Sequence, residues 1–166
     1  AGDFIMGSMD DRETFYGKET PQHRPTLPAF EISQYPITNK QFEAFVQDGG
    51  YTTKQWRTCW TKAGLQWKGN RSEPDRYGGV YDLPNHPAVM VTWYEAVAFC
   101  HWLGQKLGQP VSLPSEAQWE RAARHTDGRR YPWGEQITPD HANYAQTGIG
   151  TTTAVGIFPK GASQCG

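Results

Sequence analysis

Several features that would assign a function directly are missing from this sequence of 166 residues. No two histidines lie three or four residues apart, and there is no CxxC, no phosphate-binding glycine loop and no Gly-x-Ser-x-Gly elbow. Local motifs therefore give no support to a helical zinc site, dithiol redox chemistry, P-loop nucleotide binding or α/β-hydrolase catalysis.

Cysteine is scarce. Cys59, Cys100 and Cys165 are an odd number at wide spacing, which does not fit a disulfide framework and favours a reducing compartment. The N-terminus shows neither a basic region nor a long apolar core, so no signal peptide is recognised, although a signal already removed would leave the same picture. We expect a cytoplasmic rather than a secreted protein.

Surplus charge and long apolar runs are lacking too. Sixteen basic residues oppose seventeen acidic ones, and no basic stripe indicates nucleic acid. No apolar run approaches the roughly 20 residues that cross a bilayer. We expect neither a nucleic-acid partner nor a membrane partner.

Aromatic residues, glycine and proline are instead abundant. Aromatic residues make up 13% of the chain, with seven tryptophans, and there are 18 glycines and 12 prolines. This mixture is typical of a loop-rich domain whose loops are pinned by aromatic side chains, and the length fits one domain over residues 1–166.

Three capping boxes predict three helices. They pair Thr38 with Gln41, Thr92 with Glu95, and Ser115 with Gln118. The second helix is the best patterned, and the residues expected on its apolar face are Trp93, Ala96, Val97, Cys100, Leu103 and Leu107. Short apolar or alternating stretches predict strands at residues 4–8, 30–37, 88–91 and 154–158, with a polar surface loop over residues 10–26. The sequence therefore predicts a loop-rich α+β fold with about three helices and short antiparallel strands.

The segment 51–87 shows no sustained periodicity. Loops of this length within a compact domain are usually functional or mobile. Trp56, Trp60 and Trp67 lie in this segment, where they either contact a ligand in a recess or anchor the loop.

The cysteines give no clear nucleophile. Cys100 falls on the apolar helix face, where a small buried hydrophobic side chain is expected. Cys59 and Cys165 have polar or glycine-rich neighbours and could be exposed, but a reactive thiol needs a nearby histidine or cation. We assign no catalytic residue and favour inert thiols.

Residues 143–150, NYAQTGIG, combine an amide, a hydroxyl and glycines. Such a loop can wrap oxygen atoms around a hard cation, although without a carboxylate its calcium affinity would be weak. An ordinary Asn/Gly turn is the alternative.

Six motifs in order complete the pattern: GDFIMGS at 2–8, YPITN at 35–39, HPAV with VTW at 86–93, EA with FCHWL at 95–103, LPSEAQWERAAR at 113–124 and YPWG at 131–134. Together they resemble the formylglycine-generating enzyme, or sulfatase-modifying factor, family. The resemblance covers essentially the whole chain and implies a C-type-lectin-like α+β fold.

The family includes copper-dependent oxidases that convert a sulfatase cysteine to formylglycine, iron enzymes that join sulfur to histidine betaines, and binding modules. The resemblance implies a structural calcium ion held by Asn143, Tyr144, Thr147 and Ile149, with Thr147 where the enzymes carry an acidic ligand. No cysteine here matches the copper-binding pair, so copper is not expected in this chain.

From these features we expect a domain that lacks the family's C-terminal part and acts as a ligand- or protein-binding module, without catalysis by this chain alone. Its partner would be a protein, a small molecule or a C-terminal fragment of the same protein. The alternative is the N-terminal part of a formylglycine-generating oxidase, or of a related iron enzyme forming C–S bonds, whose catalytic residues lie C-terminal to Gly166.

Overall fold

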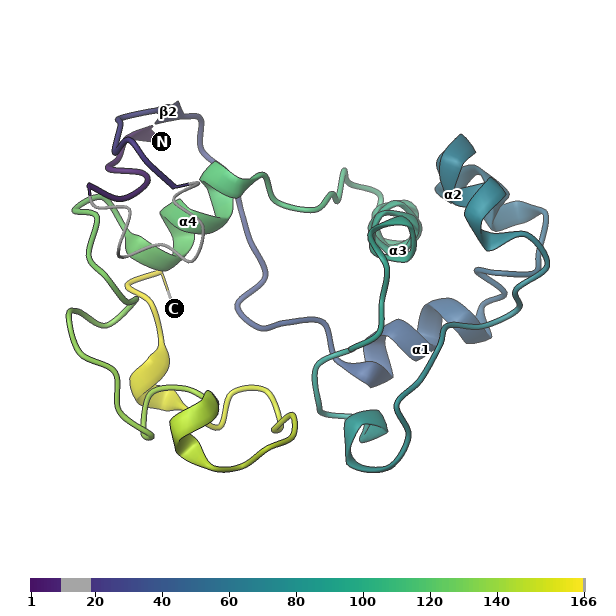
Figure 1. Ribbon diagram of the computed structural model, residues 1–166. Coiled ribbons are helices and arrows are strands. Elements are labelled where there is room, and N and C mark those ends of the chain that lie inside the picture. The colour runs from purple at the N-terminus through teal and green to yellow at the C-terminus, as the bar shows by residue number, and fades with distance from the viewer. Residues whose placement is uncertain (10–18, 166) are drawn as a thin grey trace. The chain divides into compact units, whose positions relative to one another are not determined.

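The computed structural model describes residues 1–9 and 19–165. The chain divides into two compact units (Figure 1): unit 1 contains Ala1–Gln34, Pro114–Gly148 and Phe158–Gly166, and unit 2 contains Tyr35–Leu113 and Ile149–Ile157. Part of the expected polar loop, residues 10–18, lies outside the described residues, as does Gly166. The single domain over residues 1–166 stays a prediction.

Two of the predicted capping boxes begin the main helices of unit 2. Helix α1 (Asn39–Gln47) starts after Thr38, and helix α3 (Trp93–Leu107) starts after Thr92. In both, the cap hydroxyl accepts a hydrogen bond from the third helical residue, whose own side chain returns to the cap backbone. Gly108 ends α3 in the left-handed region, at φ 68°, where glycine avoids the steric cost of a side chain.

The segment 51–87 is more ordered than its sequence suggests. It contains the 3₁₀ helix η2 (Gln55–Cys59), the helix α2 (Lys62–Lys68) and the 3₁₀ helix η3 (Gly79–Asp82). The described residues therefore contain four α-helices rather than about three. Helix α2 is too short to show an amphipathic period, and it packs with η2 against α3 (Figure 1), so tertiary contacts rather than local pattern stabilise it.

Unit 2 is built around aromatic rings. Phe45 is fully buried, and its ring contacts five others, at centroid distances between 5.7 and 6.3 Å: Phe42, Tyr51, Trp60, Phe99 and Trp102. Gly50 permits this packing, because a Cβ at that position would lie 2.1 Å from the Phe45 ring. The core therefore joins α1, α3 and the chain between α1 and α2.

Unit 1 contains the small antiparallel sheet and helix α4 (Glu116–Arg124). Strands β1 (Gly2–Asp3) and β2 (Thr26–Leu27) pair Gly2 with Leu27. The third predicted capping box, at Ser115, is present at the start of α4. Helix α4 has no buried residue, so burial of an apolar face does not explain what keeps this helix packed within unit 1.

Several strand predictions are wrong. The N-terminal strand is confined to β1, with an isolated bridge between Met6 and His23, and residues 30–37, 88–91 and 154–158 contain no strand. A strand needs one continuous neighbouring strand to pair with. Residues 4–8 instead donate to several separate segments, for example Ile5 to the Thr126 carbonyl and Met6 to the His23 carbonyl, and the later segments make isolated contacts such as that from Ala88 N–H to the Ile37 carbonyl. The mixture of helices with a small antiparallel sheet is still compatible with an α+β fold. No helix among the described residues is both long and apolar enough to cross a membrane.

Candidate functional site

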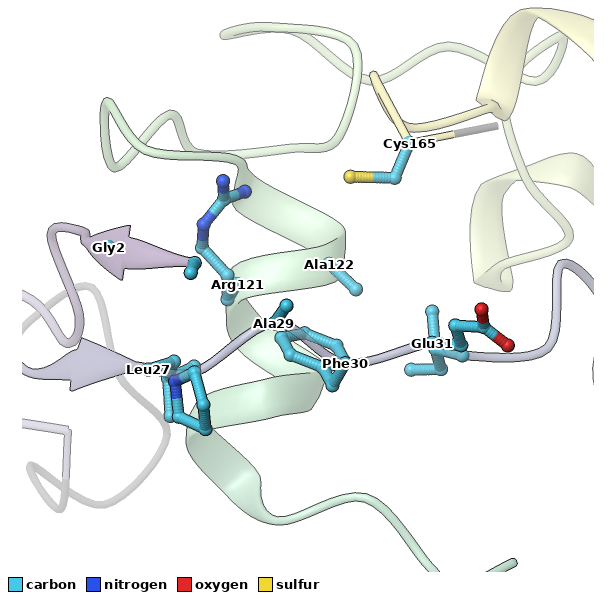
Figure 2. Close-up of a pocket in the computed structure, with 11 residues that line it drawn as sticks. Gly2, Leu27, Ala29, Phe30, Glu31, Arg121, Ala122 and Cys165 are labelled. Atoms are coloured by element: carbon cyan, nitrogen blue, oxygen red, sulfur yellow. The ribbon is translucent and has the colours of Figure 1, made fainter. Parts of the chain in front are cut away.

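A cavity of about 480 Å³ opens in unit 1, beside α4 (Figure 2). Figure 2 shows Ala122 of α4 and the Cys165 thiol beside the segment that follows β2, while the Arg121 side chain, which also lines the cavity, extends from α4 away from Ala29 and Phe30. That segment supplies an apolar wall made by Leu27, Pro28, Ala29, Phe30 and Ile32. The volume lies within the usual range for small-ligand sites, roughly 300–1,000 Å³.

The cavity carries two charged side chains of opposite sign. Arg121 and Glu31 both line it, and neither forms a hydrogen bond or ion pair within residues 1–9 and 19–165. These groups could receive a small ligand with an apolar body and polar ends. Sequence reasoning missed this recess, because it treated residues 30–37 as a strand inside a sheet.

The three tryptophans considered as ligand contacts have different environments in unit 2. Trp56 and Trp60 are only 4% and 5% exposed, and their indole N–H groups donate to the carbonyls of Asp48 (2.9 Å) and Gly50 (2.8 Å). These two tryptophans are enclosed by the core, so they anchor the segment 51–87 there and are not available to contact a ligand. Trp67 is half-buried, with the Arg71 guanidinium 4.6 Å from its ring centroid.

Three of the four oxygen-bearing residues considered for calcium lie together in unit 1. The Thr147 hydroxyl donates to the Tyr144 carbonyl at 2.6 Å and lies 3.2 Å from Asn143 Oδ1, at the 3₁₀ helix η4 (Ala145–Thr147). The fourth, Ile149, belongs to unit 2. These oxygens of unit 1 are all uncharged, and the Thr147 hydroxyl is hydrogen-bonded to the other two residues within the turn.

The cysteines do not fit a copper centre. Cys59 is fully buried, contrary to the possibility of exposure, because η2 turns it toward α3, where Gln105 Nε2 lies 3.3 Å from its sulfur. Burial raises the pKa of both the Cys59 and Cys100 thiols, whereas soft metal ions bind thiolates. Only Cys165 is exposed. Nowhere in the described part of the chain do three His, Cys, Asp or Glu side chains gather as a metal site.

The sequence did not predict a buried hydrogen-bonded pair in unit 2, formed by Tyr51 and Glu95. Glu95 is 1% exposed, and the Tyr51 hydroxyl donates to its Oε1 at 2.5 Å, while Thr92 donates to its Oε2 through both the backbone N–H and the hydroxyl. Burial, and then the hydrogen bond to the Glu95 carboxylate, raise the pKa of Tyr51. The capping box predicted the Thr92 contact, but no local pattern predicts that Tyr51 approaches from 44 residues away.

A comparison of this sequence with models of known protein families finds one that matches nearly the whole chain. The family model of the sulfatase-modifying factor enzyme 1-like domain matches residues 1–165. The chain belongs to this family. Membership accounts for the order of the six motifs in the sequence, which lie at β1, at the start of α1, at the start of α3 and within it, along α4 and in the loop after α4.

Sulfatase-modifying factor relatives with named activities are similar over most of this chain. The hercynine oxygenase of Mycobacterium tuberculosis is 34% identical over 98% of the chain, which corresponds to 40% of that protein. The formylglycine-generating enzyme of Thermomonospora curvata is 34% identical over 83% of the chain and 52% of its own length, and that of M. tuberculosis is 31% identical over 95% and 65%. The chain thus spans between 40% and 65% of the length of these relatives.

Proposed function

We propose that this chain is the scaffold portion of an oxygen-using, metal-dependent enzyme of the formylglycine-generating type. The observation that carries the proposal is the similarity to enzymes named for that activity over 83–95% of the chain. Because the described cysteines do not fit copper, the redox metal would be bound by groups outside the described residues. The same relationship supports a C-type-lectin-like fold for the complete domain.

A hercynine oxygenase-type activity is a second candidate. It is favoured by one observation, the 98% coverage of this chain by two hercynine oxygenases, each 34% identical to it. The two candidates differ in substrate and metal, and they therefore predict different requirements for oxygen consumption.

The test uses the natural polypeptide that contains this sequence. With copper and a cysteine-containing peptide, the first candidate predicts oxygen uptake and an aldehyde that reacts with a hydrazide probe. With iron, hercynine and a thiol, the second predicts oxygen uptake and a sulfur-containing hercynine product. If neither mixture consumes oxygen above the metal-only control, the enzymatic proposal is wrong and a binding role takes its place.

The binding-module hypothesis has less support than the enzyme alternative. The relatives whose names state an activity are named as enzymes, and two of the three tryptophans considered as contacts lie in the core. Its best remaining basis is the cavity beside α4, which could hold a small-molecule or peptide ligand. The unpaired set of three cysteines keeps a reducing, cytoplasmic setting as our expectation.

For the loop around Asn143, Tyr144 and Thr147 we propose weak calcium binding, supported by the proximity of three neutral oxygens, which a cation would hold in place of the hydrogen bonds from the Thr147 hydroxyl. A cation bound only by the folded state must raise the melting temperature. We expect a small increase in millimolar calcium, abolished by Asn143→Ala and enlarged by Thr147→Asp, which adds a carboxylate at the same position. Equal melting temperatures with calcium and with chelator, in both the unmodified chain and Thr147→Asp, would remove the proposal.

A further inference from the structure

One stretch of unit 2 contains basic residues only. Residues 52–72 include five of the sixteen basic residues of the chain and none of its seventeen acidic ones. The five are Lys54, Arg57, Lys62, Lys68 and Arg71, and we call the exposed surface of residues 52–72 that bears them the η2–α2 basic face. They are never adjacent in sequence, so no basic run is visible before the chain folds.

The fold turns these cations outward. Trp56, Cys59, Trp60 and Gly64 are the buried residues of the stretch and fix it against the core, while Lys54, Arg57, Lys62 and Arg71 are exposed and Lys68 is half-buried. Among the described residues, none of these five cations has an ion-pair partner.

Acidic residues lie at both ends of the stretch, but none of those described forms an ion pair with the five cations. The Asp48 carbonyl accepts from the Trp56 indole, and Asp48 pairs with Lys106 instead. Glu73 and Asp75 line one pocket with Arg71.

From α3, His101 Nδ1 lies 2.7 Å from the Cys59 carbonyl and the tilted Tyr94 ring contacts Trp67, and neither residue carries a carboxylate. Burial, and then the positive charge of Arg57, lower the pKa of Lys68, which indicates that like charges are close together. Arg71 is held in place without neutralisation, since it donates to the Trp67 carbonyl at 2.7 Å and stacks on the Trp67 ring.

From this geometry we infer that the η2–α2 basic face is a docking surface for an acidic segment of another polypeptide. Charge complementarity carries the assignment: exposed cations without counter-ions attract carboxylates and speed their encounter. Arg71 in particular presents a fixed planar fork, which suits a carboxylate.

Two other anionic partners fit less well. A long nucleic acid would continue past the stretch onto acidic residues that flank it, Asp48 on one side and Glu73 and Asp75 on the other, and the Trp67 ring is covered by Arg71 rather than free to stack on a base. A membrane surface is usually bound through inserted apolar side chains, and none of the large exposed hydrophobic residues lies within 52–72.

The test is fluorescence anisotropy of a labelled oligoglutamate peptide with the full chain. The triple variant Lys54→Glu, Arg57→Glu, Lys62→Glu reverses three exposed charges of the face. The control Arg24→Glu, Lys40→Glu, Arg130→Glu reverses three exposed cations elsewhere, so the change in net charge is the same. Melting curves of both variants check that the fold is retained.

We expect salt-sensitive binding that weakens about tenfold or more in the η2–α2 variant and less than about twofold in the control. The inference is overturned by an absence of binding at low salt, or by equal losses in the two variants. It is equally overturned if a single-stranded oligonucleotide or phosphatidylserine vesicles bind this face more tightly than the peptide.

Discussion

Unit 1 and unit 2 are stabilised by different interactions. Of the buried hydrophobic side chains among the described residues, ten form the core of unit 2, and Phe4 alone belongs to unit 1. In unit 1 the Arg124 guanidinium instead donates to the carbonyls of Gly7, Gly128 and Arg129 and pairs with Glu120. Glu120 in turn accepts from the Gly7 N–H at 2.8 Å.

This difference predicts which substitutions destabilise each unit most. Burial of aromatic surface is non-directional, so unit 2 is weakened most by loss of volume. Hydrogen bonds donated by a partly buried guanidinium are directional, so unit 1 is weakened by removing one charged group that connects several backbone segments. The following experiments test this contrast, beginning with the largest effect.

The substitution Phe45→Ala should have the largest effect. It removes a fully buried ring that contacts five other rings, and the loss of such a side chain lowers the free energy of unfolding by about 3–5 kcal/mol. Urea denaturation followed by tryptophan fluorescence measures the change. The control Leu107→Ala shortens an exposed side chain at the end of α3 and should stay within about 0.5 kcal/mol. Equal losses in the two variants would contradict an aromatic core in unit 2.

The next effect concerns the charged group within that core. Glu95→Ala leaves the Tyr51 hydroxyl and the Thr92 N–H without their acceptor, and we expect a loss of roughly 2–4 kcal/mol. Glu95→Gln keeps an acceptor and should cost less. A double-mutant cycle with Tyr51→Phe measures the coupling between the two side chains. A coupling energy near zero would mean that the core tolerates the pair without depending on it.

A smaller effect is expected for Arg124→Ala in unit 1. The substitution removes the donors that hold the segments around Gly7 and Gly128 to α4, at about 1–3 kcal/mol. Hydrogen exchange of the α4 amides reports on this unit separately from α3. The matched control is Arg121→Ala in the same helix, since Arg121 has no partner among the described residues and should stay within about 0.5 kcal/mol. If both variants exchange alike, the charged network does not stabilise unit 1.

The sequence predicted best those elements that are specified locally. All three capping boxes are present, because a cap and its third helical residue interact within one turn. The apolar face of α3 was only partly right: Cys100 is buried, but Trp93 is 61% exposed, while Phe99 and Trp102 face the core. This helix is apolar on more than one side, so its period does not determine which side faces the aromatic rings of α1.

The candidate sites depended on contacts between distant residues and were predicted less well. The cavity beside α4 joins residues 27–32, 121–122 and Cys165, and no local pattern brings these together. The expected strand over 30–37 had the right alternation but no neighbouring strand to pair with. The sequence predicted that the tryptophans of 51–87 either anchor this segment or contact a ligand. Only their burial in the folded chain, seen for Trp56 and Trp60, distinguishes the two roles.

The smallest expected effect concerns stability in acid, and it distinguishes the two units through two aspartates, exposed Asp127 and half-buried Asp48. The hydrogen bond from the Arg129 guanidinium holds the pKa of Asp127 in unit 1 below its ordinary value. In unit 2, hydrogen bonds from Lys106 and then Trp102 lower the pKa of Asp48. A lowered pKa in the folded state contributes stability that is complete above the ordinary aspartate pKa of about 3.9 and is lost as the pH falls through the folded value.

Asp127→Asn should therefore flatten the acid dependence of unit 1 without altering that of unit 2, and Asp48→Asn should do the reverse. Both changes should be small, because exposed ion pairs are screened by solvent. Hydrogen exchange of α4 and α3 amides, measured from about pH 5 down to about pH 2, follows each unit separately after correction for intrinsic exchange. If one substitution flattens the acid profile of both units equally, the two units unfold as one, and the contrast between them describes their interactions but not their stability.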